Sequence, residues 1–554
     1  MDLSTTASLT NETLSIGANA TGTWGWVSGS NEPGGTSWPG ATYTITLNVT
    51  VANPALSIST VKIYRVDANG GPNAYGLALV GQTNAVESLA NVGTLQFTIT
   101  GAAQTANVGD RLAVKVFIKN SSSTVQSFSY DAGAGAVSEL IATPAFALSP
   151  SPSPSPSLPP TTTPIKHVVI IIQENRSFNN LFMNFPGALT ATQGTMSNGT
   201  VVALKPQPLE AVPDLGHGHK AWESAYDSGK MDGFNNEGGF ITTQGPTYPY
   251  SYVPQSEIAP YWQLASQYTL ADHFFQSNTG PSYPAHQYLI AGTSDLAAMN
   301  PNYGRIWGCD SPVGTTVQQL DNNGNLIPGP FPCYDYTTIA DSLDQAGLKW
   351  HYYAAAPTHV FSAYDAVRHI RNSTYWSQDV IAPASQFLTD VGNGQLAEVT
   401  WITPYYRTSD HPGNGTNGGP AWVASVVDAV GASKFWSSTA IFITWDDWGG
   451  WFDPVTPPQL DLMGLGFRVP LIVVSPYAKP AYVSHTQHEF ASILRFTEEN
   501  FSLPQLGTTD VRADNLADCF NFAASPLPFK RVSGSLPTSV LRQQEAGSKP
   551  DDDY

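Results

Sequence analysis

A proline- and serine-rich stretch constrains the fold of this 554-residue chain more than any other feature of its sequence. Residues 149–164 read SPSPSPSPSLPPTTTP. Because repeated prolines cannot donate backbone hydrogen bonds and favour extended polyproline II, this stretch is expected to act as a semi-rigid linker. A chain of this length is also too long for a single hydrophobic core. We therefore predict two domains, at 1–148 and 165–533, and a flexible tail at 534–554.

The segment before the linker shows apolar and polar residues in alternation. Its clearest stretches are TYTITLNVTV at 42–51, VKIYRV at 61–66, LQFTIT at 95–100 and RLAVKVFI at 111–118. A period of two indicates half-buried strands, and no helical pattern lies between them. We predict an all-β sandwich of the immunoglobulin-like type. Since the segment contains no histidine and no catalytic cluster, it fits either a spacer or a module that contacts a glycan or a surface.

After the linker, continuous apolar runs alternate with helical patterns. The runs are expected to be buried strands and lie at 167–172, 348–353, 398–403, 439–444 and 469–474. Amphipathic patterns at 335–347 and 489–500 predict helices. Strands that alternate with helices predict an α/β domain with a mostly parallel sheet and helices on both faces. Sites in such folds form beyond the carboxyl ends of the strands.

Polar clusters follow several of these strand candidates. Glu174 and Asn175 follow the first run, Asp446 and Asp447 follow the fourth, and a further cluster lies at 410–411. The carboxyl ends of parallel strands share one edge of a sheet, so these groups should converge. Adjacent buried carboxylates repel each other unless a cation or bound protons compensate, and carboxylate and amide oxygens suit a divalent ion. One pair alone would better fit a solvated loop or a helix cap, but several such strand ends predict one divalent metal ion.

Ser282 lies in the stretch NTGPSYPAHQYLIAG, just before a helical pattern. A serine in this place often caps a helix. The same place would put its hydroxyl at a helix N-terminus, where free N–H groups favour an anion. A metal ion at that oxygen would lower its pKa and make it a nucleophile. The local sequence leaves both roles open.

Histidines are the candidate proton donors, because imidazole titrates near neutral or mildly acid pH. They lie at His217 and His219 in DLGHGHKAW, His351 in WHYY, His411 in SDHPG, and His485 and His488 in SHTQHEF. A single histidine is more often a structural hydrogen-bonding group. Capping or packing is the expected role of the last pair. For His351, a structural role in the core or on a sheet face is at least as well supported as a catalytic role.

The formal charge of −19 disfavours binding to nucleic acid and to anionic membrane surfaces, although a metal ion can reverse the field at one site. No apolar run is long enough for stable membrane insertion. Only 12% of residues are charged, which suits a secreted or periplasmic protein, although no signal peptide is visible in this chain. Cys309 and Cys333 could pair in an oxidising compartment, and a reduced pair is the alternative.

Several long motifs resemble the bacterial phosphoesterase family that contains acid phosphatases and the haemolytic and non-haemolytic phospholipases C. In the family's order they include IKHVVIIIQENRSFNNLF, DLGHGHKAW, GPSYPAHQYLIAG, VTWITPYYRTSDHPG, ITWDDWGGWFDPV, GFRVPLIVVSPYAK and SHTQHEFASILRF. The resemblance covers about residues 165–522 and does not extend to the β domain or the linker. It implies an alkaline-phosphatase-like α/β fold with a metal-dependent site for phosphoester hydrolysis.

The resemblance also implies roles for individual residues. Glu174, Asn175, Asp446 and Asp447 match metal ligands. Ser282 matches the nucleophile, which also contacts the metal ion.

The histidines match less uniformly. His217 and His411 match histidines that bind phosphoryl oxygens or protonate the leaving group, and His219 is the alternative if the register differs. His351 falls near a further family position.

The favoured function is a metal-dependent acid phosphatase that acts on phosphomonoesters through a phosphoserine intermediate. The family's phospholipases usually carry threonine at the nucleophile position and often have C-terminal β domains, whereas this chain has Ser282 and an N-terminal β segment. The alternative is a phospholipase C that acts on phospholipid head-group phosphodiesters. A second alternative is a non-catalytic surface-binding protein, against which the intact site residues argue.

Overall fold

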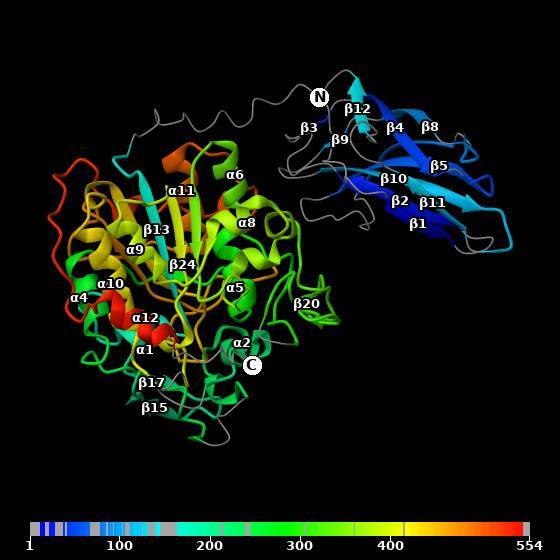
Figure 1. Cartoon of the computed structure of the whole chain (residues 1–554). Coiled ribbons are helices and arrows are strands. Elements are labelled where there is room, and N and C mark those ends of the chain that lie inside the picture. Colours follow the sequence, from blue (N-terminus) through cyan, green and yellow to red (C-terminus); the bar gives the residue numbers. More distant parts are fainter. Residues whose placement is uncertain are drawn as a thin grey trace. The chain divides into compact units, whose positions relative to one another are not determined.

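The chain forms two compact units in the computed structural model, Met1–Pro160 and Thr161–Tyr554 (Figure 1). In the second unit the structure describes residues 163–546 except 211–213, 239–243, 304–305, 359 and 414–415. In the first unit it describes 12–16, 21–27, 37–38, 41–51, 53–66, 78–84, 87–91, 93–101, 104–105, 111–124, 126–130 and 139–143. Most of the predicted linker lies outside the described residues.

The first unit contains two five-stranded sheets, and their strand pairings are antiparallel. The stretches with a period of two all lie within strands, as predicted. Their alternate side chains, among them Ile45, Ile99 and Val116, are buried. The immunoglobulin-like sandwich itself stays a prediction.

The strands of the first unit have the following bounds. One sheet has the order β1 (Glu12–Ile16), β11 (Gln126–Tyr130), β4 (Ala41–Val51) and β12 (Glu139–Thr143), with β8 (Gly93–Gly101) also paired to β4. The other has the order β2 (Thr21–Val27), β10 (Arg111–Asn120), β5 (Leu56–Val66) and β6 (Ala78–Thr83), with β7 (Glu87–Ser88) also paired to β5. A short ribbon joins β3 (Ser37–Trp38) and β9 (Gln104–Thr105).

An eight-stranded sheet forms the centre of the second unit (Figure 1). Its order is β23 (Val380–Ile381), β22 (Trp350–Tyr353), β24 (Val399–Ile402), β13 (His167–Gln173), β25 (Thr439–Trp445), β26 (Leu471–Val474), β18 (Thr269–Ala271) and β27 (Tyr482–Ser484). Each predicted apolar run overlaps one of these strands. The strands β24, β25 and β26 are buried along their whole length, as expected for a sheet that is covered on both faces.

One strand departs from the parallel arrangement. The strand β26 is antiparallel to both of its neighbours, β25 and β18, whereas the other pairings in the sheet are parallel. The predicted mostly parallel sheet is therefore confirmed, but it is a mixed sheet. A continuous apolar run shows that a strand is buried and does not show its direction, so the sequence pattern could not reveal this reversal.

Helices lie on both sides of this sheet (Figure 1). One group consists of α5 (Ser282–Ala291), α6 (Ile339–Gln345) and α11 (Phe490–Phe501), and another of α4 (Ala259–Gln267), α9 (Gln386–Gly392) and α10 (Gly419–Gly431). Both predicted helices form, and capping boxes begin them: Thr338 with Asp341 for α6, and Glu489 with Ser492 for α11. Among the described residues, no helix has the length and apolar character needed to cross a bilayer.

The remaining elements are short. The helices are α1 (Phe178–Phe182), α2 (His219–Tyr226), α7 (Arg368–Arg371), α8 (Thr374–Asp379) and α12 (Thr538–Ala546). The two-stranded ribbons pair β14 (Gln193–Thr195) with β15 (Val201–Ala203), β16 (Lys205–Pro206) with β17 (Ser251–Tyr252), β19 (Phe274–Phe275) with β28 (His488–Glu489), and β20 (Gln319–Leu320) with β21 (Leu326–Ile327). A disulfide joins Cys309 and Cys333, which confirms the paired alternative.

Part of the predicted flexible tail forms the helix α12 instead. Leu541 is fully buried, and the Glu545 carboxylate accepts a hydrogen bond of 2.8 Å from the backbone N–H of Ser385. The tail prediction is therefore wrong for this helix, because few apolar side chains anchor it and they give no clear helical period. Residues 547–554 lie outside the described part of the chain.

Candidate active site

Two neighbouring parallel strands bring Glu174 and Asp446 together. The strands β13 and β25 are paired in register with Gln173 opposite Trp445, so the residues that follow them leave the sheet side by side. The pairing continues past the strand ends, since the Asp446 N–H donates to the Gln173 carbonyl oxygen at 2.9 Å. The structure therefore brings these two polar clusters to one edge of the sheet.

Asn175 turns the chain sharply at the end of β13. Its φ of 56° lies in the left-handed region, which asparagine tolerates better than most residues. Gly449 also has a positive φ, 61°, and a Cβ atom at this position would lie 2.0 Å from the Asn175 carbonyl oxygen. The close approach of these two turns thus explains why a glycine follows the aspartates in WDDWGG.

The two aspartates divide their oxygens between the backbone and the site. Oδ1 of Asp446 accepts hydrogen bonds from the N–H groups of Asn175 (3.0 Å) and Asp447 (2.7 Å). Oδ1 of Asp447 accepts one from the Gly449 N–H at 2.7 Å, and its Oδ2 accepts one from the Ser282 hydroxyl at 3.2 Å. Backbone hydrogen bonds therefore fix both carboxylates and leave one oxygen of each for other partners.

Ser282 is the first residue of α5 and is fully buried. It is not the N-cap, because Pro281 occupies that position. In the first turn, the Tyr283 N–H already donates to Asn300 Oδ1 at 2.9 Å, and Pro284 has no N–H. The start of this helix therefore offers a bound anion fewer donors than the sequence pattern indicated.

His286 lies one turn after Ser282 on α5 and belongs to the same cluster. Its Nε2 lies 3.4 Å from Oε1 of Glu174 and 3.8 Å from Oδ2 of Asp446, and all these side chains are buried. His286 is not among the candidate residues that the sequence motifs indicated. Its spacing of four from the candidate nucleophile could have identified it, because residues four apart share one face of a helix.

A metal ion fits this cluster. Glu174, His286 and Asp446 each offer a ligand atom within 4.8 Å of the other two. Oδ2 of Asp446 and Oδ1 of Asn175 are buried without a hydrogen-bond partner among the described residues, which is costly unless something else binds them. Burying these carboxylates together with Asp447 is also unfavourable without a compensating cation.

His217 lies next to Asn175 and Asp447. Its Nε2 is 3.2 Å from Asn175 Nδ2 and 3.9 Å from Asp447 Oδ2. Its Nδ1 is 2.8 Å from the Leu215 carbonyl oxygen, so Nδ1 carries a proton and donates it there. In the neutral ring, Nε2 then accepts from the Asn175 amide. His217 becomes a donor toward a substrate only when Nε2 also binds a proton.

Glu237 is a buried acid that the sequence analysis did not identify. Burial raises the pKa of Glu237 well above its usual range, and the charge of His217 opposes this shift. Both carboxyl oxygens of Glu237 lack a hydrogen-bond partner among the described residues.

His219, the alternative to His217, instead contacts Thr279 Oγ1 through Nδ1 at 2.8 Å and so faces the loop before Ser282.

His411 is buried, and its Nδ1 lies 2.7 Å from the Pro412 carbonyl oxygen. The preceding residue, Asp410, braces the end of β25, because its Oδ2 accepts hydrogen bonds from Tyr261 (2.8 Å) and Trp445 (2.9 Å). Burial raises the pKa of Asp410 to about 6. The role of His411 as a proton donor stays a prediction.

His351 lies within β22, and its ring contacts Tyr353 and Asp379. Nδ1 is 3.2 Å from the Tyr353 hydroxyl, and Nε2 is 3.8 Å from Asp379 Oδ1. The next residue, Tyr352, points to the side of the cluster, because its hydroxyl donates to the Phe361 carbonyl oxygen at 2.6 Å and the Phe361 ring stacks on His286. Because side chains alternate along a strand, His351 points to the other face, and its catalytic role stays a prediction.

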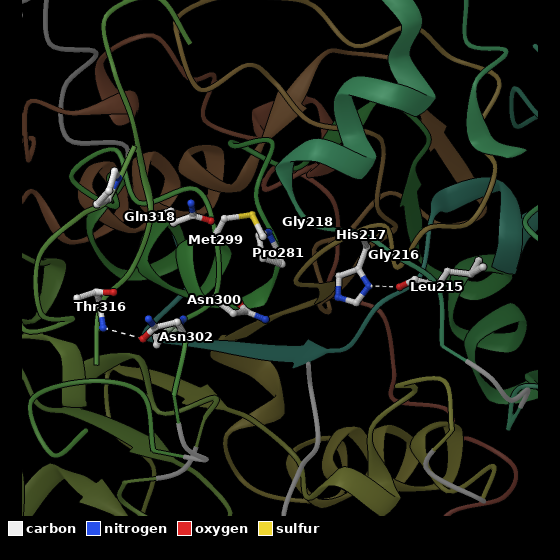
Figure 2. Close-up of a pocket in the computed structure, with 12 residues that line it drawn as sticks. Leu215, Gly216, His217, Gly218, Pro281, Met299, Asn300, Asn302, Thr316 and Gln318 are labelled. Atoms are coloured by element: carbon white, nitrogen blue, oxygen red, sulfur yellow. Dashed lines mark hydrogen bonds between the residues drawn. The ribbon is translucent and has the colours of Figure 1, made fainter. Parts of the chain in front are cut away.

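A cavity of about 560 Å³ opens beside the cluster (Figure 2). His217 and Pro281, the residue before Ser282, line one part of it. The rest of the lining includes Asn302 and Gln318. None of the 12 lining residues is an aspartate, glutamate, lysine or arginine, and none is a phenylalanine, tyrosine or tryptophan. The cavity therefore suits a neutral polar group next to the reacting atoms.

The profile of the Phosphoesterase family matches residues 165–504. A "Non-hemolytic phospholipase C" from Burkholderia pseudomallei is 26% identical over 472 residues, which cover 70% of this chain and 61% of that protein. "Phospholipase C B" from Mycobacterium tuberculosis is 24% identical over 446 residues, which cover 66% and 80%. "Non-specific phospholipase C4" from Arabidopsis thaliana is 26% identical over 402 residues, which cover 61% and 68%. The chain thus spans less than two thirds of the Burkholderia protein.

Solved structures resemble the chain weakly. One described as a protein in the alkaline phosphatase superfamily from Vibrio parahaemolyticus aligns with a TM-score of 0.31 and 9% identity, over 64% of this chain and 69% of that chain. A likeness at this level carries no argument, so the alkaline-phosphatase-like arrangement stays a prediction. The family profile, in contrast, covers more than half of the chain and all the motifs that form the carboxylate cluster. The chain belongs to the Phosphoesterase family, as the resemblance of its motifs indicated.

Proposed function

We propose that this chain is a metal-dependent phosphoester hydrolase whose nucleophile is Ser282. The observation that carries the proposal is the 3.2 Å hydrogen bond from the Ser282 hydroxyl to Asp447 within the buried carboxylate cluster. A carboxylate acceptor and a cation site beside a buried hydroxyl can both activate it as a nucleophile, because the carboxylate can accept its proton and a cation lowers its pKa. Membership of the Phosphoesterase family supports the same class of reaction.

The residues that would hold the metal ion are those of the cluster. Glu174, Asp446 and His286 supply one ligand atom each, and the oxygens of Asn175 and Asp447 extend the set. A divalent ion bound there supplies positive charge for the phosphoryl oxygens and lowers the pKa of a nearby hydroxyl. Oxygen atoms with one imidazole suit both hard and borderline ions, so the ligand set does not select a single metal.

The chain's own groups would move the protons. Asp447 Oδ2, which accepts the hydrogen bond of the Ser282 hydroxyl, would take its proton as the oxygen attacks phosphorus. His217, when Nε2 is protonated, would donate to a phosphoryl oxygen from the cavity side. His411 is proposed to protonate the leaving oxygen, after which water hydrolyses the phosphoserine.

The comparisons favour a phosphodiester substrate over a monoester. The relatives from Burkholderia, Mycobacterium and Arabidopsis all carry the name phospholipase C, which supports this alternative better than the acid phosphatase. The cavity beside His217 supports it as well, because it leaves room for a second substituent on phosphorus. We therefore propose hydrolysis of the phospholipase C type. An acid phosphatase is the second candidate, which Ser282 favours because the family's phospholipases usually carry threonine there.

A substrate panel tests the proposal. Metal-depleted protein receives Mg²⁺, Mn²⁺, Ca²⁺ or Zn²⁺ singly and is assayed with phosphatidylcholine micelles, bis(p-nitrophenyl) phosphate and p-nitrophenyl phosphate. We expect one ion to restore diester turnover, and Ser282→Ala to lower it by about 10³-fold or more. Faster monoester turnover would favour the acid phosphatase. Failure of every ion with every substrate would contradict a hydrolase and favour the surface-binding alternative.

The location and the β unit belong to the proposal too. The Cys309–Cys333 disulfide supports a secreted or periplasmic location, because such bonds persist in oxidising compartments. For the first unit, contact with a glycan or a surface remains the proposed role beside that of a spacer. Binding of the isolated purified chain to a glycan array would distinguish the two.

A further inference from the structure

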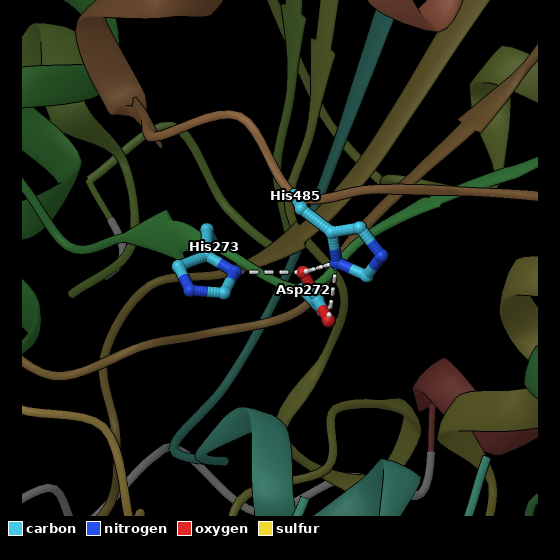
Figure 3. Close-up of side chains that lie close together, drawn as sticks. All are labelled: Asp272, His273 and His485. Carbon is cyan, nitrogen blue, oxygen red and sulfur yellow. Dashed lines mark hydrogen bonds and ion pairs between the residues drawn. The ribbon is translucent and has the colours of Figure 1, made fainter. Parts of the chain in front are cut away.

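Away from the carboxylate cluster, one buried carboxylate lies between two imidazoles (Figure 3). Nδ1 of His273 is 2.7 Å from Asp272 Oδ1, and Nδ1 of His485 is 2.9 Å from Oδ1 and 3.0 Å from Oδ2. One ligand atom of each residue lies within 4.8 Å of the other two. We propose that Asp272, His273 and His485 form a second metal site, which takes a divalent cation of the zinc class.

The sheet places this group apart from the candidate active site. Asp272 and His273 follow β18, and His485 follows β27, which is adjacent and parallel to β18. The Asp272 N–H donates to the Ser484 carbonyl oxygen at 3.0 Å, so the two strand ends are joined by backbone hydrogen bonding. Three strand spacings separate β18 from β13, which is about 14 Å at the usual distance between strands. A cation here would not be the ion held by Glu174.

The donor atoms suit zinc. Two imidazole nitrogens with one carboxylate oxygen are a common zinc ligand set, in which a water completes four-coordinate geometry. Asp272 is already oriented, because its Oδ2 accepts a hydrogen bond of 2.7 Å from the Leu189 N–H. His485 is 61% exposed and His273 25% exposed, which leaves one side of the group open to an entering ion and its water.

The separations between donor atoms require a small adjustment. Ligands about 2.1 Å from a tetrahedral ion lie about 3.4 Å from each other, so each imidazole would have to move outward by about 0.5 Å. The exposed His485 can make this movement without disturbing the core. The competing explanation of this geometry is that two neutral imidazoles donate hydrogen bonds to the carboxylate without a metal ion. Measurement of bound zinc distinguishes this explanation from a metal site.

The charges around the group leave the carboxylate available to a cation. Arg468 lies close, but its Nη1 donates to the Asp272 carbonyl oxygen, at 2.6 Å, and not to the carboxylate. Its Nε and Nη2 form a two-fold ion pair with Asp453 at 2.8 and 2.9 Å, which neutralises the guanidinium. In the part of the chain that the structure describes, the Asp272 carboxylate pairs with imidazoles and with no lysine or arginine.

Such an ion would act on structure and not on the reacting atoms. It would tie the end of β27 to the segment that follows β18. That segment continues through β19 toward Ser282, so the ion would anchor the start of the stretch that carries the candidate nucleophile. The expected consequence of losing it is lower stability, with turnover per folded molecule unchanged within about twofold.

Metal content of the full chain tests the inference. The protein is chelated, supplied with excess Zn²⁺, desalted and analysed for bound zinc. The variants are Asp446→Asn, His485→Gln and the double variant His273→Gln/His485→Gln. His369→Gln is the matched control, because His369 also contacts carboxylates, Asp335 at 2.6 Å and Asp341 at 2.9 Å, but no second imidazole among the described residues contacts them.

We expect two zinc equivalents in the parent and in His369→Gln, and one each in Asp446→Asn and the double variant. Zinc should raise the melting temperature of the parent more than that of His485→Gln. Because the His485 side chain is exposed, this variant should fold, so a smaller effect of zinc cannot be attributed to misfolding. Equal zinc content in the parent and the double variant would overturn the inference, and so would a single parental equivalent that Asp446→Asn removes. Zinc content is measured without any turnover assay. A result that overturns the second metal site therefore does not contradict the proposed hydrolase, which the substrate panel tests.

Discussion

Nε2 of His286 lies 3.4 Å from Oε1 of Glu174, a contact that joins α5 to the end of β13 inside the candidate active site. The same helix begins with Ser282, so one rigid element carries both the candidate nucleophile and an imidazole of the carboxylate cluster. Any ion held by Glu174 and His286 would therefore be positioned relative to the hydroxyl by the helix itself.

Replacing His286 by glutamine should weaken binding of the activating ion. Loss of a residue that orients a metal ligand typically costs about 10–100-fold in affinity, and loss of a ligand should cost at least as much. We expect His286→Gln to need about that much more metal for half-maximal turnover, with a smaller loss of rate at saturating metal. Turnover measured against metal concentration checks this, and an unchanged midpoint would exclude His286 from the metal site.

Ser282 should be replaceable by threonine but not by alanine. Threonine keeps a hydroxyl that can donate to Asp447, whereas alanine removes the nucleophile and should cost about 10³-fold or more in kcat. We therefore expect Ser282→Thr to recover most of the rate that Ser282→Ala loses, as measured on bis(p-nitrophenyl) phosphate. Equal losses in the two variants would contradict a nucleophilic hydroxyl, provided that both proteins unfold at the parental urea concentration.

Gly449→Ala should disrupt the candidate site through the backbone. A Cβ atom there would lie 2.0 Å from the Asn175 carbonyl oxygen, and the φ of 61° adds strain for any residue with a side chain. We expect a loss of more than about 3 kcal/mol in the free energy of unfolding, together with a large loss of activity.

Gly507→Ala is the matched control for this clash. Gly507 has a φ of 79°, and a Cβ atom there would have nothing within 4 Å, so alanine should cost only about 1 kcal/mol through φ. Urea unfolding of both variants checks the difference. Similar losses would show that backbone strain, and not the contact with Asn175, accounts for the effect.

His369 should make stability depend on pH. Its hydrogen bonds to Asp341 and Asp335 raise the pKa of His369 to about 9. Because the unfolded value is about 6.5, the folded protein binds more protons between these values. The stabilisation is therefore complete below about pH 6.5 and is lost as the pH rises through about 9.

His369→Gln should accordingly lower the free energy of unfolding at about pH 6 and have little effect at about pH 10. The loss should stay below about 1 kcal/mol, because the side chain is more than a third exposed and water screens the pair. Urea unfolding of parent and variant at both pH values measures it. An equal loss at both would show that packing, and not the charge of the imidazole, is responsible.

The strand ends of the candidate site could be predicted from the sequence because each consists of neighbouring residues. One buried apolar run is followed by Glu174 and Asn175, and another by Asp446 and Asp447. The apolar run predicts a strand, and the carboxylates at its end predict a cation, because burying them unpaired is unfavourable. Parallel pairing then brings the two ends together, and that pairing follows from the alternation of strands and helices.

Features that depend on packing could not be predicted in the same way. The spacing of four puts His286 on the same helix face as Ser282, but only the fold shows that this face lies against Glu174. The helix α12 was missed because Leu541 and Glu545 stabilise it through contacts with distant parts of the chain, and not through a local pattern. The tautomer of His217 likewise depends on a carbonyl oxygen, that of Leu215, whose position only the folded backbone determines.

The reversed strand β26 has a consequence for how this protein can change over evolution. Since β26 starts opposite the end of β25, the chain between Asp446 and Leu471 leaves and re-enters the sheet on the same side. Such a connection can lengthen or shorten without crossing the sheet and without altering any strand pairing. Changes of length are therefore expected in the exposed part of this connection, residues 459–462, because residues 446–453 and 463–471 are buried.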